Sequence, residues 1–320
     1  MNQVRTLDET AAARFLRDFR AIAGNGKKRV GLAVSGGPDS LALLLLAAET
    51  LDHVEAATVD HGLRPEGASE ASYVSGIAKT LAVRHSILTL PPKPPGNTSA
   101  WARKQRYAVL EKWADALELD LILTAHHADD QLETMLMRLN RGAGVGGMAG
   151  IRTLRGRIAR PLMAWRKAEL VALLDAQGIE AVDDPSNHDD RYDRARLRRA
   201  LEQASWLDPA GAVRAGSALA SADQALNWAA DDYLSRRGTL ALGIVSLDAK
   251  GLPHELVRRI VIKCMAQVMP GAAPRSDELD RLIGALRARK ICTLAGVKCA
   301  GGDFWTFQKA PPRRKNDQIC

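Results

Sequence analysis

The amino-acid sequence predicts an α/β protein with a doubly wound, mainly parallel sheet, followed by a second, mainly helical domain. From Arg29 onward, short apolar runs alternate with longer segments of helical periodicity. Polar residues cluster directly after several of these runs, and the alternation ends near residue 205. Near-continuous apolar strands are typical of a parallel sheet that helices cover on both faces, and such sheets bind ligands at the carboxyl ends of their strands.

The first strand is predicted at residues 30–34, because this short run is apolar and is followed by turn residues. A helix then extends to Leu51. The same strand–helix pattern is repeated three more times, at 54–59 with 66–81, 84–90 with 99–117, and 119–125 with 129–140.

Residues 141–150 contain five glycines and are expected to form a loop. A short strand at 160–162 and helices at 166–177 and 191–203 are expected to complete the first domain. A boundary near residue 205 separates a domain at 1–204 from a domain at 205–320. The second domain is predicted to contain helices and then short strand-like pieces, with the helices at 213–234, 253–269 and 276–289.

The overall composition is that of an ordinary globular protein, with 46% hydrophobic and 26% charged residues in 320. The longest apolar run, residues 41–48, is far shorter than the ~20 residues that a membrane span requires. The N-terminal residues are charged and lack the apolar segment of a secretory signal. We therefore expect a cytoplasmic protein without a membrane partner.

The charge balance favours a polyanionic partner. Lysine and arginine number 45 against 37 aspartate and glutamate residues, which gives a formal net charge of +8. Long-range attraction and counterion release then favour nucleic acid, although a generally basic enzyme would show the same balance.

The strongest local motif is the loop Ser-Gly-Gly-Pro-Asp-Ser between the first strand and its helix. Two adjacent glycines let successive N–H groups point into one concavity, and the helix N-terminus adds partial positive charge. The serine hydroxyls can donate hydrogen bonds, and Asp39 can hold Mg²⁺ against phosphate oxygens. A simple tight turn is the alternative. The predicted phosphate-binding residues are Ser35, Gly36, Gly37, Pro38, Asp39 and Ser40.

A second cluster follows the fourth strand and contains two histidines and three acids: His126, His127, Asp129, Asp130 and Glu133. Separations of three and four residues place Glu133 beside both aspartates on one helix face. Carboxylates at a ligand-binding edge can bind an ammonium group and receive its proton. Helix capping explains one or two of the acids, and metal ligation by the histidines is a further alternative that leaves the phosphate loop unexplained.

Basic residues are concentrated in residues 191–199, which hold five arginines in nine positions. Such a helix face is often merely solvated, but the net charge makes an RNA-binding surface an equal alternative. An aromatic content of 4% argues against base stacking on aromatic platforms as the main binding mode and favours recognition by shape and backbone. The candidate RNA-binding residues are Arg103, Arg106, Arg141, Arg191, Arg194, Arg196 and Arg198.

The strand–Ser-Gly-Gly-x-Asp-Ser–helix pattern resembles the pyrophosphate loop of the N-type ATP pyrophosphatases, which cleave ATP between its α and β phosphates. Further motifs over residues 29–200 resemble, in order and spacing, the tRNA(Ile)-lysidine synthetase family. The family usually has Asn where this chain has Ala195, so any hydrogen bond of that Asn is absent. The matching segments are VDHGLR at 59–64, ARKQRY at 102–107, TAHHADDQLET at 124–134, RGAG at 141–144, RPL at 160–162, DPSN at 184–187 and RARLR at 194–198.

The resemblance implies an ATP-dependent ligase that joins free L-lysine to carbon 2 of the wobble cytidine in an isoleucine tRNA with a CAU anticodon. ATP would adenylate the cytidine, pyrophosphate would leave into the loop at 35–40, and lysine would then displace AMP. The resemblance also implies that the cluster after the fourth strand handles lysine, and it makes Asp60 and His61 candidates for the nucleotide pocket. The second domain is expected to position the tRNA, and a homodimer is compatible with this pattern.

Cysteine spacing distinguishes this reading from its nearest alternative, a tRNA thiolation enzyme with the same loop. Such enzymes commonly use paired cysteines, whereas the four cysteines here lie in the last 57 residues without a C-x-x-C pair. The same spacing argues against a zinc ribbon, an iron–sulfur site and a disulfide framework. A catalytically silent RNA-binding module is the third alternative, and the intact loop and acids argue against it.

Overall fold

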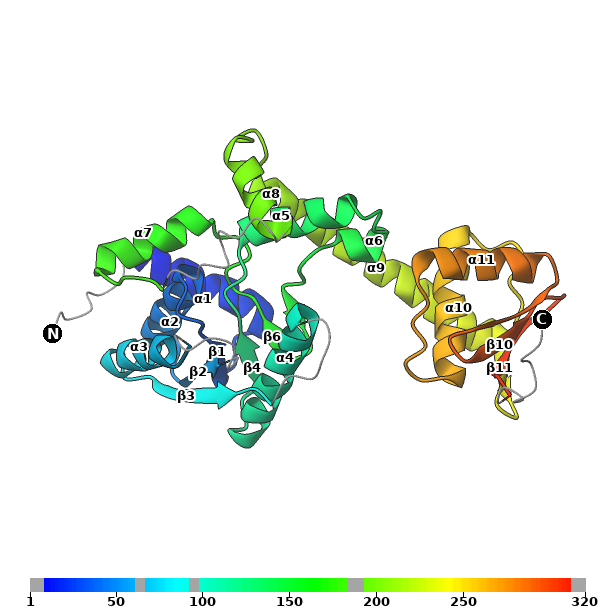
Figure 1. The fold of residues 1–320 in the computed structure, drawn as a ribbon, viewed down its shortest axis with the longest axis horizontal. Helices are drawn as coiled ribbons and strands as arrows, with labels where there is room; N and C mark the ends of the chain where they lie inside the picture. The colour runs from blue at the N-terminus through cyan, green and yellow to red at the C-terminus, as the bar shows by residue number, and fades with distance from the viewer. Residues whose placement is uncertain (1–8, 61–66, 92–97, 183–192, 312–320) are drawn as a thin grey trace. The chain divides into compact units, whose positions relative to one another are not determined.

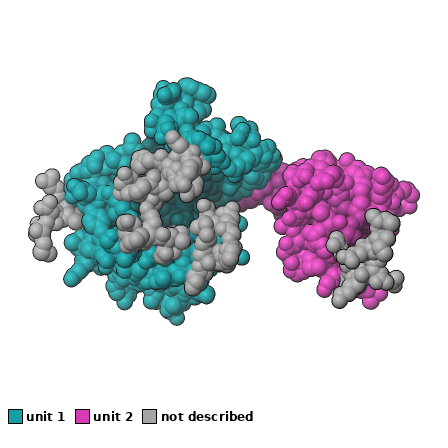
Figure 2. All heavy atoms as spheres, in the orientation of Figure 1, with its two compact units in different colours: residues 1–220 teal, residues 221–320 magenta. Residues whose placement is uncertain are grey.

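The computed structural model describes residues 9–60, 67–91, 98–182 and 193–311, and all structural statements below refer to these ranges. The chain divides into two compact units, Met1–Ala220 and Ser221–Cys320, which are described separately (Figure 2). None of the helices in the described ranges combines the length and apolar composition needed to cross a membrane.

The first unit is built on a six-stranded sheet with strand order β3-β2-β1-β4-β6-β5 (Figure 1). Neighbouring strands are parallel except for β5 and β6, so the predicted doubly wound, mainly parallel sheet is confirmed. The strands are β1 (Val30–Ala33), β2 (Val54–Asp60), β3 (Arg84–Thr89), β4 (Leu121–Leu123), β5 (Leu154–Arg155) and β6 (Ile158–Ala159).

The last parallel strand lies earlier in the chain than predicted. Ile158 and Ala159 pair with β4, and residues 160–162 turn away beyond them, so the strand expected at 160–162 was wrong. Pro161 has no backbone N–H to donate to a neighbouring strand, which explains why pairing ends before it. As a consequence, Arg160 lies at the carboxyl end of β6.

Helices cover both faces of the sheet (Figure 1): α1 (Glu9–Ala23), α2 (Pro38–Thr50), α3 (Gly67–Thr80) and α7 (Lys167–Gln177) on one face, and α4 (Thr98–Ala116) on the other. The run at 41–48 is uniformly apolar because α1 and α7 pack over α2 and bury it. On the other face, Trp113 approaches Gly31 so closely that a Cβ there would lie 2.5 Å from its ring. Helix α1 was not predicted from the sequence.

A topological switch point lies between β1 and β4, which are neighbours in the sheet although two strand–helix pairs separate them in the chain. At such a point the chain leaves the two strands in opposite directions and opens a crevice at their carboxyl ends. There β1 leads into α2, and β4 leads into α5 (Ala128–Leu139), against which α8 (Asp193–Glu202) packs (Figure 1). Within the expected loop at 141–150, Val145–Met148 form one helical turn, α6.

The division between the units falls inside the long helix α9 (Pro209–Arg237) rather than ahead of it. The first turns of α9 pack closely on the first unit, where a Cβ on Gly216 would lie 2.0 Å from Gln131 Nε2. Gln131 is itself held by Ala149 O and by the N–H of Ile151, at 3.1 and 2.7 Å. This close contact explains why residues 209–220 belong to the first unit.

The second unit contains a five-stranded antiparallel sheet of order β7-β8-β11-β10-β9 and the two helices expected after residue 253. The sequence had indicated only the strand-like pieces near its end, and β7 and β8 were not predicted. Cys264 and Cys299 lie in its core, where burial raises the pKa of both thiols to about 12 and keeps them protonated. The elements are β7 (Gly238–Ala241), β8 (Ile244–Leu247), α10 (His254–Val268), α11 (Ser276–Arg287), β9 (Ile291–Leu294), β10 (Val297–Ala300) and β11 (Trp305–Lys309).

Candidate active site

The predicted phosphate loop turns sharply out of β1 and ends at the N-terminus of α2. Gly36 has φ +89°, a backbone conformation that favours glycine, and Pro38 starts the helix, where its missing N–H costs nothing. The Ser35 N–H donates to Ser40 Oγ (3.1 Å), and Ser40 Oγ donates to Gly37 O (2.9 Å). These bonds hold the loop around the helix N-terminus, where partial positive charge favours an anion.

A cavity of about 320 Å³ opens at this loop, a size that fits small-molecule and cofactor sites. Polar groups of Ser35, Asp39 and Ser40 lie on one side. Apolar side chains of β2 and α4 also line the cavity and suit the flat face of a base. The lining further includes Ala57, Val59, Leu110, Arg103, Arg106, Thr124, His126, Asp130 and Arg194.

Of the two nucleotide-pocket candidates, Asp60 is not among the described residues that line this cavity. Asp60 ends β2 one residue beyond Val59, and its carboxylate faces the start of α3, where a Cβ on Gly67 would lie 2.9 Å from Oδ1. His61 lies outside the described residues.

His127 is buried between three carboxylates at the start of α5. Its Nε2 lies 3.4 Å from Asp39 Oδ2 and 3.5 Å from Asp130 Oδ2, and its Nδ1 lies 3.5 Å from Asp129 Oδ2. Burial alone would lower the pKa of His127, but the three carboxylates raise it to about 9. The imidazolium therefore links the phosphate loop to the acidic helix at neutral pH.

We expect the stabilisation from this imidazolium to depend on pH. Because the pKa of His127 in the folded protein lies above the ordinary 6.5, the contribution is complete below about pH 6.5 and is lost as pH rises through about 9. Urea unfolding of the wild type and of His127→Gln gives the difference in their free energies of unfolding at each pH. This difference should be about 1–3 kcal/mol smaller above pH 9 than below pH 6.5. His254→Gln, at an exposed histidine 3.4 Å from Asp280, serves as the control. A pH-independent difference at His127 would contradict the charged state.

The neighbouring His126 has the opposite electrostatic environment. It lines the cavity, and Thr124 Oγ1 lies 3.0 Å from its Nδ1. Burial and the guanidinium groups of Arg160, Arg106 and Arg103 lower the pKa of His126 to about 3. A neutral imidazole with this pKa is too weak a base to collect a proton from an ammonium group, but it can exchange hydrogen bonds with a ligand.

Asp129 turns away from the cavity and ties α5 to α7. Its carboxylate accepts hydrogen bonds from the Arg166 guanidinium at 3.1–3.3 Å and from the Lys167 N–H at 2.8 Å. Burial alone would raise the pKa of Asp129, but His127 and these two residues hold it far below its ordinary range. Its contacts support a role in holding the helices together.

The other two acids form one charge network with two arginines of α8. Arg194 donates to Asp130 Oδ1 (2.7 Å) and to Glu133 Oε2 (2.6 Å), and Arg198 donates to Glu133 Oε1 (2.7 Å). Glu133 is only 4% exposed, so its charge depends on these partners. The sequence had assigned the acids to lysine and the arginines to RNA, whereas the structure brings the two groups together. Ala195, between the arginines, is buried.

The remaining arginine candidates fall into two groups. Arg103 and Arg106 line the cavity, and both guanidinium groups lie over the Tyr107 ring, 5.5 and 5.3 Å from its centre. Arg141 and Arg196 are exposed and both pair with Asp193. Arg191 lies outside the described residues.

Arg160 is a site residue to which the sequence gave no role. It is buried, close to the cavity residues His126 and Arg103, and its Nη1 donates to Arg152 O (2.7 Å). Its position directly after β6, at the ligand-binding edge of the sheet, is the signal that could have revealed it.

The use of ATP implies Mg²⁺, and the phosphate loop offers a suitable ligand. Asp39 Oδ1 is buried and has no hydrogen-bond partner among the described residues, and oxygen atoms of carboxylates are the donors that Mg²⁺ prefers. In the described ranges, no three or more His, Cys, Asp or Glu side chains are grouped to hold a metal ion. Asp39 fits an ion that phosphate oxygens also bind.

A family model described as a PP-loop domain matches residues 7–205. Together with the loop at the switch point of the sheet, this match defines the chain as an ATP-using enzyme of the PP-loop class. A curated tRNA(Ile)-lysidine synthase of Novosphingobium aromaticivorans is 43% identical over 315 residues, covering 96% of each chain. One from Zymomonas mobilis is 40% identical over 296 residues, covering 90% of each. The chain belongs to the tRNA(Ile)-lysidine synthase family, as the sequence motifs predicted.

A solved structure shares this fold over much of the chain. A U34-tRNA thiolase from Methanococcus maripaludis aligns with a TM-score of 0.55, covering 66% of this chain and 80% of that chain. Its sequence identity is 16%, so the likeness shows the fold alone.

Proposed function

We propose that this protein joins L-lysine to carbon 2 of the wobble cytidine of an isoleucine tRNA with a CAU anticodon, in the cytoplasm, and releases AMP and pyrophosphate. The observation that carries the proposal is that Asp130 lines the same cavity as the phosphate loop and is joined to Glu133 through the guanidinium of Arg194. A carboxylate pair beside an ATP-phosphate site suits a reaction in which an amine attacks an adenylated centre.

In the first step, ATP adenylates the cytidine oxygen and pyrophosphate leaves. The loop at 35–40 holds the departing phosphates through its backbone N–H groups, and Asp39 would hold Mg²⁺, which would supply positive charge at these phosphates. His127 holds the Asp39 side chain in place, because His127 Nε2 lies 3.4 Å from Asp39 Oδ2. The apolar wall formed by Val59 and Leu110 supports the face of a base.

In the second step, lysine displaces AMP. Its ε-ammonium group has an ordinary pKa of about 10.4 and must lose a proton before it can attack. Asp130 and Glu133 bind this cation in place of, or beside, the guanidinium groups of α8, and one of the two carboxylates receives the proton. His126 is neutral and acts as a hydrogen-bonding group toward the bound base or nucleotide.

The tRNA approaches the mouth of the cavity, where Arg103 and Arg106 bind phosphates beside the modified nucleotide. The exposed Arg141 and Arg196 extend this surface, and the second unit positions the rest of the tRNA. These assignments agree with the net charge of +8.

The proposal is tested by incubating the protein with ATP, labelled lysine and an unmodified CAU-anticodon isoleucine tRNA transcript. We expect label in the RNA, and none when the wobble cytidine is replaced by uridine. A tRNA thiolation enzyme would instead require its cysteines, so a variant with all four cysteines changed to alanine separates the two functions. Since Cys264 and Cys299 are buried thiols of the second unit, we expect this variant to retain lysine transfer within about threefold. An unlabelled RNA in the wild-type reaction would overturn the proposal.

A further inference from the structure

Residues 179–182, here called the strap, connect the end of α7 to the phosphate loop. Helix α7 stops at Gly178, which has φ +65°, and the Ile179 N–H donates back to Leu174 O (3.2 Å). Ile179 and Ala181 then pack against the main core of the first unit. The strap is therefore a defined segment whose end lies beside Gly36.

The end of the strap contacts the second residue of the phosphate loop on its outer side. The Val182 N–H donates to Gly36 O (3.0 Å). A Cβ on Gly36 would lie 3.1 Å from Val182 Cγ2 and 3.3 Å from Val74 Cγ2, so the glycine is enclosed between the strap and α3. In a trans peptide the carbonyl and the following N–H point in opposite directions. Holding the Gly36 carbonyl against the strap therefore turns the Gly37 N–H away from it.

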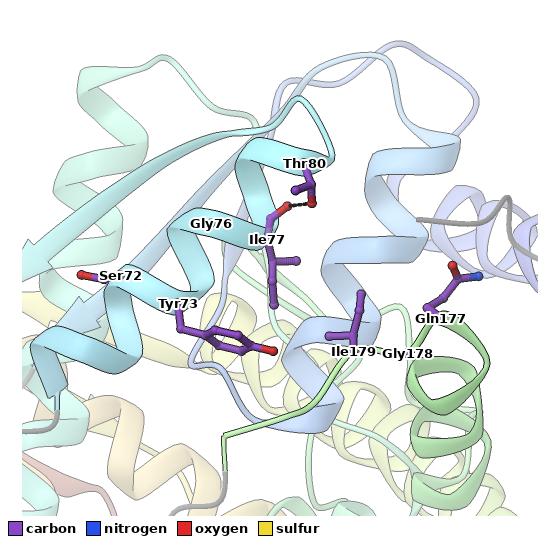
Figure 3. A pocket seen from close by; sticks show the side chains of 8 residues that line it. All are labelled: Ser72, Tyr73, Gly76, Ile77, Thr80, Gln177, Gly178 and Ile179. Atoms are coloured by element: carbon purple, nitrogen blue, oxygen red, sulfur yellow. Dashed lines mark hydrogen bonds between the residues drawn. The ribbon is translucent and has the colours of Figure 1, made fainter. Parts of the chain in front are cut away.

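Helix α3 holds the strap from the other side through Tyr73. The Tyr73 hydroxyl donates to Glu180 O (2.5 Å), and Figure 3 shows the ring reaching from α3 toward the chain that follows Gly178. Burial and the charge of Glu180 raise the pKa of Tyr73, so the hydroxyl keeps the proton that it donates. Beside the ring, α3 and the end of α7 are separated by a groove of about 310 Å³ (Figure 3). The hydrogen bond from Tyr73 to Glu180 O therefore lies beside a groove that side chains do not fill.

We infer that Tyr73 and Val182 are positioning residues for ATP binding: through the strap they fix the Gly36–Gly37 peptide of the phosphate loop in its phosphate-binding orientation. Neither residue lines the cavity, so both act through Gly36. The inference rests on the ATP-binding part of the proposed function. It adds that the strap supports the phosphate loop from outside the cavity. A neutral hydrogen bond contributes about 1 kcal/mol, which corresponds to roughly a fivefold change in an equilibrium constant.

The test compares Tyr73→Phe with Ser72→Ala by direct titration with ATP and Mg²⁺. Both variants remove one hydroxyl from the same groove, but among the described residues Ser72 Oγ bonds only to Ala68 O within α3. We expect Tyr73→Phe to raise the ATP Kd about three- to tenfold and to speed amide hydrogen exchange at residues 35–40. Ser72→Ala should change neither, and the KM for lysine should stay at the wild-type value in Tyr73→Phe.

A second variant, Val182→Ala, keeps the backbone donor and removes the side-chain contact with Gly36, and it should shift the ATP Kd in the same direction. An unchanged ATP Kd in both variants, or equal changes in Tyr73→Phe and Ser72→Ala, would overturn the inference. Because ATP titration requires neither lysine nor tRNA, it is separable from the proposed ligation. If Tyr73→Phe binds ATP more weakly but the wild-type protein never transfers labelled lysine to tRNA, the ligase proposal fails and the inference about the strap stands.

Discussion

Replacing Asp39 with alanine is expected to abolish ATP–pyrophosphate exchange, with a loss of at least about 10²- to 10³-fold. Asp39 stands in the first turn of α2, and its Oδ1 is buried and has no hydrogen-bond partner among the residues that the structure describes. Removing it deletes the proposed Mg²⁺ ligand and one of the carboxylates that hold the His127 imidazolium. The measurement is incorporation of labelled pyrophosphate into ATP in the presence of the tRNA.

Asp52→Ala provides the matched control for this prediction. Asp52 follows the other end of α2, is exposed and pairs with Lys27 at 3.1 Å, so its loss should leave exchange within about twofold of the wild-type rate. Thermal unfolding of both variants separates a folding defect from a catalytic one. If Asp39→Ala folds and still exchanges pyrophosphate, the role given to this carboxylate is wrong.

Replacing Glu133 with glutamine should separate the two halves of the reaction. The amide keeps the size of the side chain but neither balances the guanidinium charges of Arg194 and Arg198 nor accepts a proton from lysine. We expect lysine transfer to fall by about 10²- to 10⁴-fold, while tRNA-dependent pyrophosphate exchange stays within about tenfold of wild type. Labelled lysine in tRNA and labelled pyrophosphate in ATP are measured on the same preparation.

Glu255→Gln is the corresponding control, because Glu255 pairs with Arg259 at 2.8 Å in the second unit. It removes a carboxylate–arginine pair without touching the cavity, and both half-reactions should be retained. Equal losses of exchange and transfer in Glu133→Gln would show that Glu133 supports the whole site rather than the lysine step. Unchanged transfer would exclude Glu133 from lysine binding.

The network around Glu133 also limits how the arginines of α8 can act. Arg194 and Arg198 neutralise the acids in this structure, so in the proposed reaction a bound lysine would have to share those acids with them or displace them. A displaced guanidinium would be available to a phosphate of ATP or RNA. The same two arginines can therefore keep the buried acids stable without substrate and bind an anion when lysine is present.

Much of the fold followed from local sequence patterns. The apolar runs located β1, β2 and β4, because a central strand of a parallel sheet needs little more than a short apolar segment between turns. Strand β3 was also located, although it lies at the edge of the sheet and is only partly buried. Helix α1 was missed although its sequence is amphipathic, with the buried Phe15 and Phe19 four residues apart on one helix face. Strands β7 and β8, which form a tight hairpin around Leu242 and Gly243, were missed, and only the pairing of β8 with β11 joins residues far apart in the chain.

The sequence by itself determined the phosphate loop, because a strand, two glycines and a helix N-terminus are contiguous and their geometry is local. It also determined which residues carry charge at the edge of the sheet. Only the tertiary structure decided how those charges are used. It gave adjacent histidines pKa values of about 3 and about 9, and it paired the acids of α5 with arginines some sixty residues later. Burial and contacts between distant segments set the energy of a charge, and no local pattern encodes them.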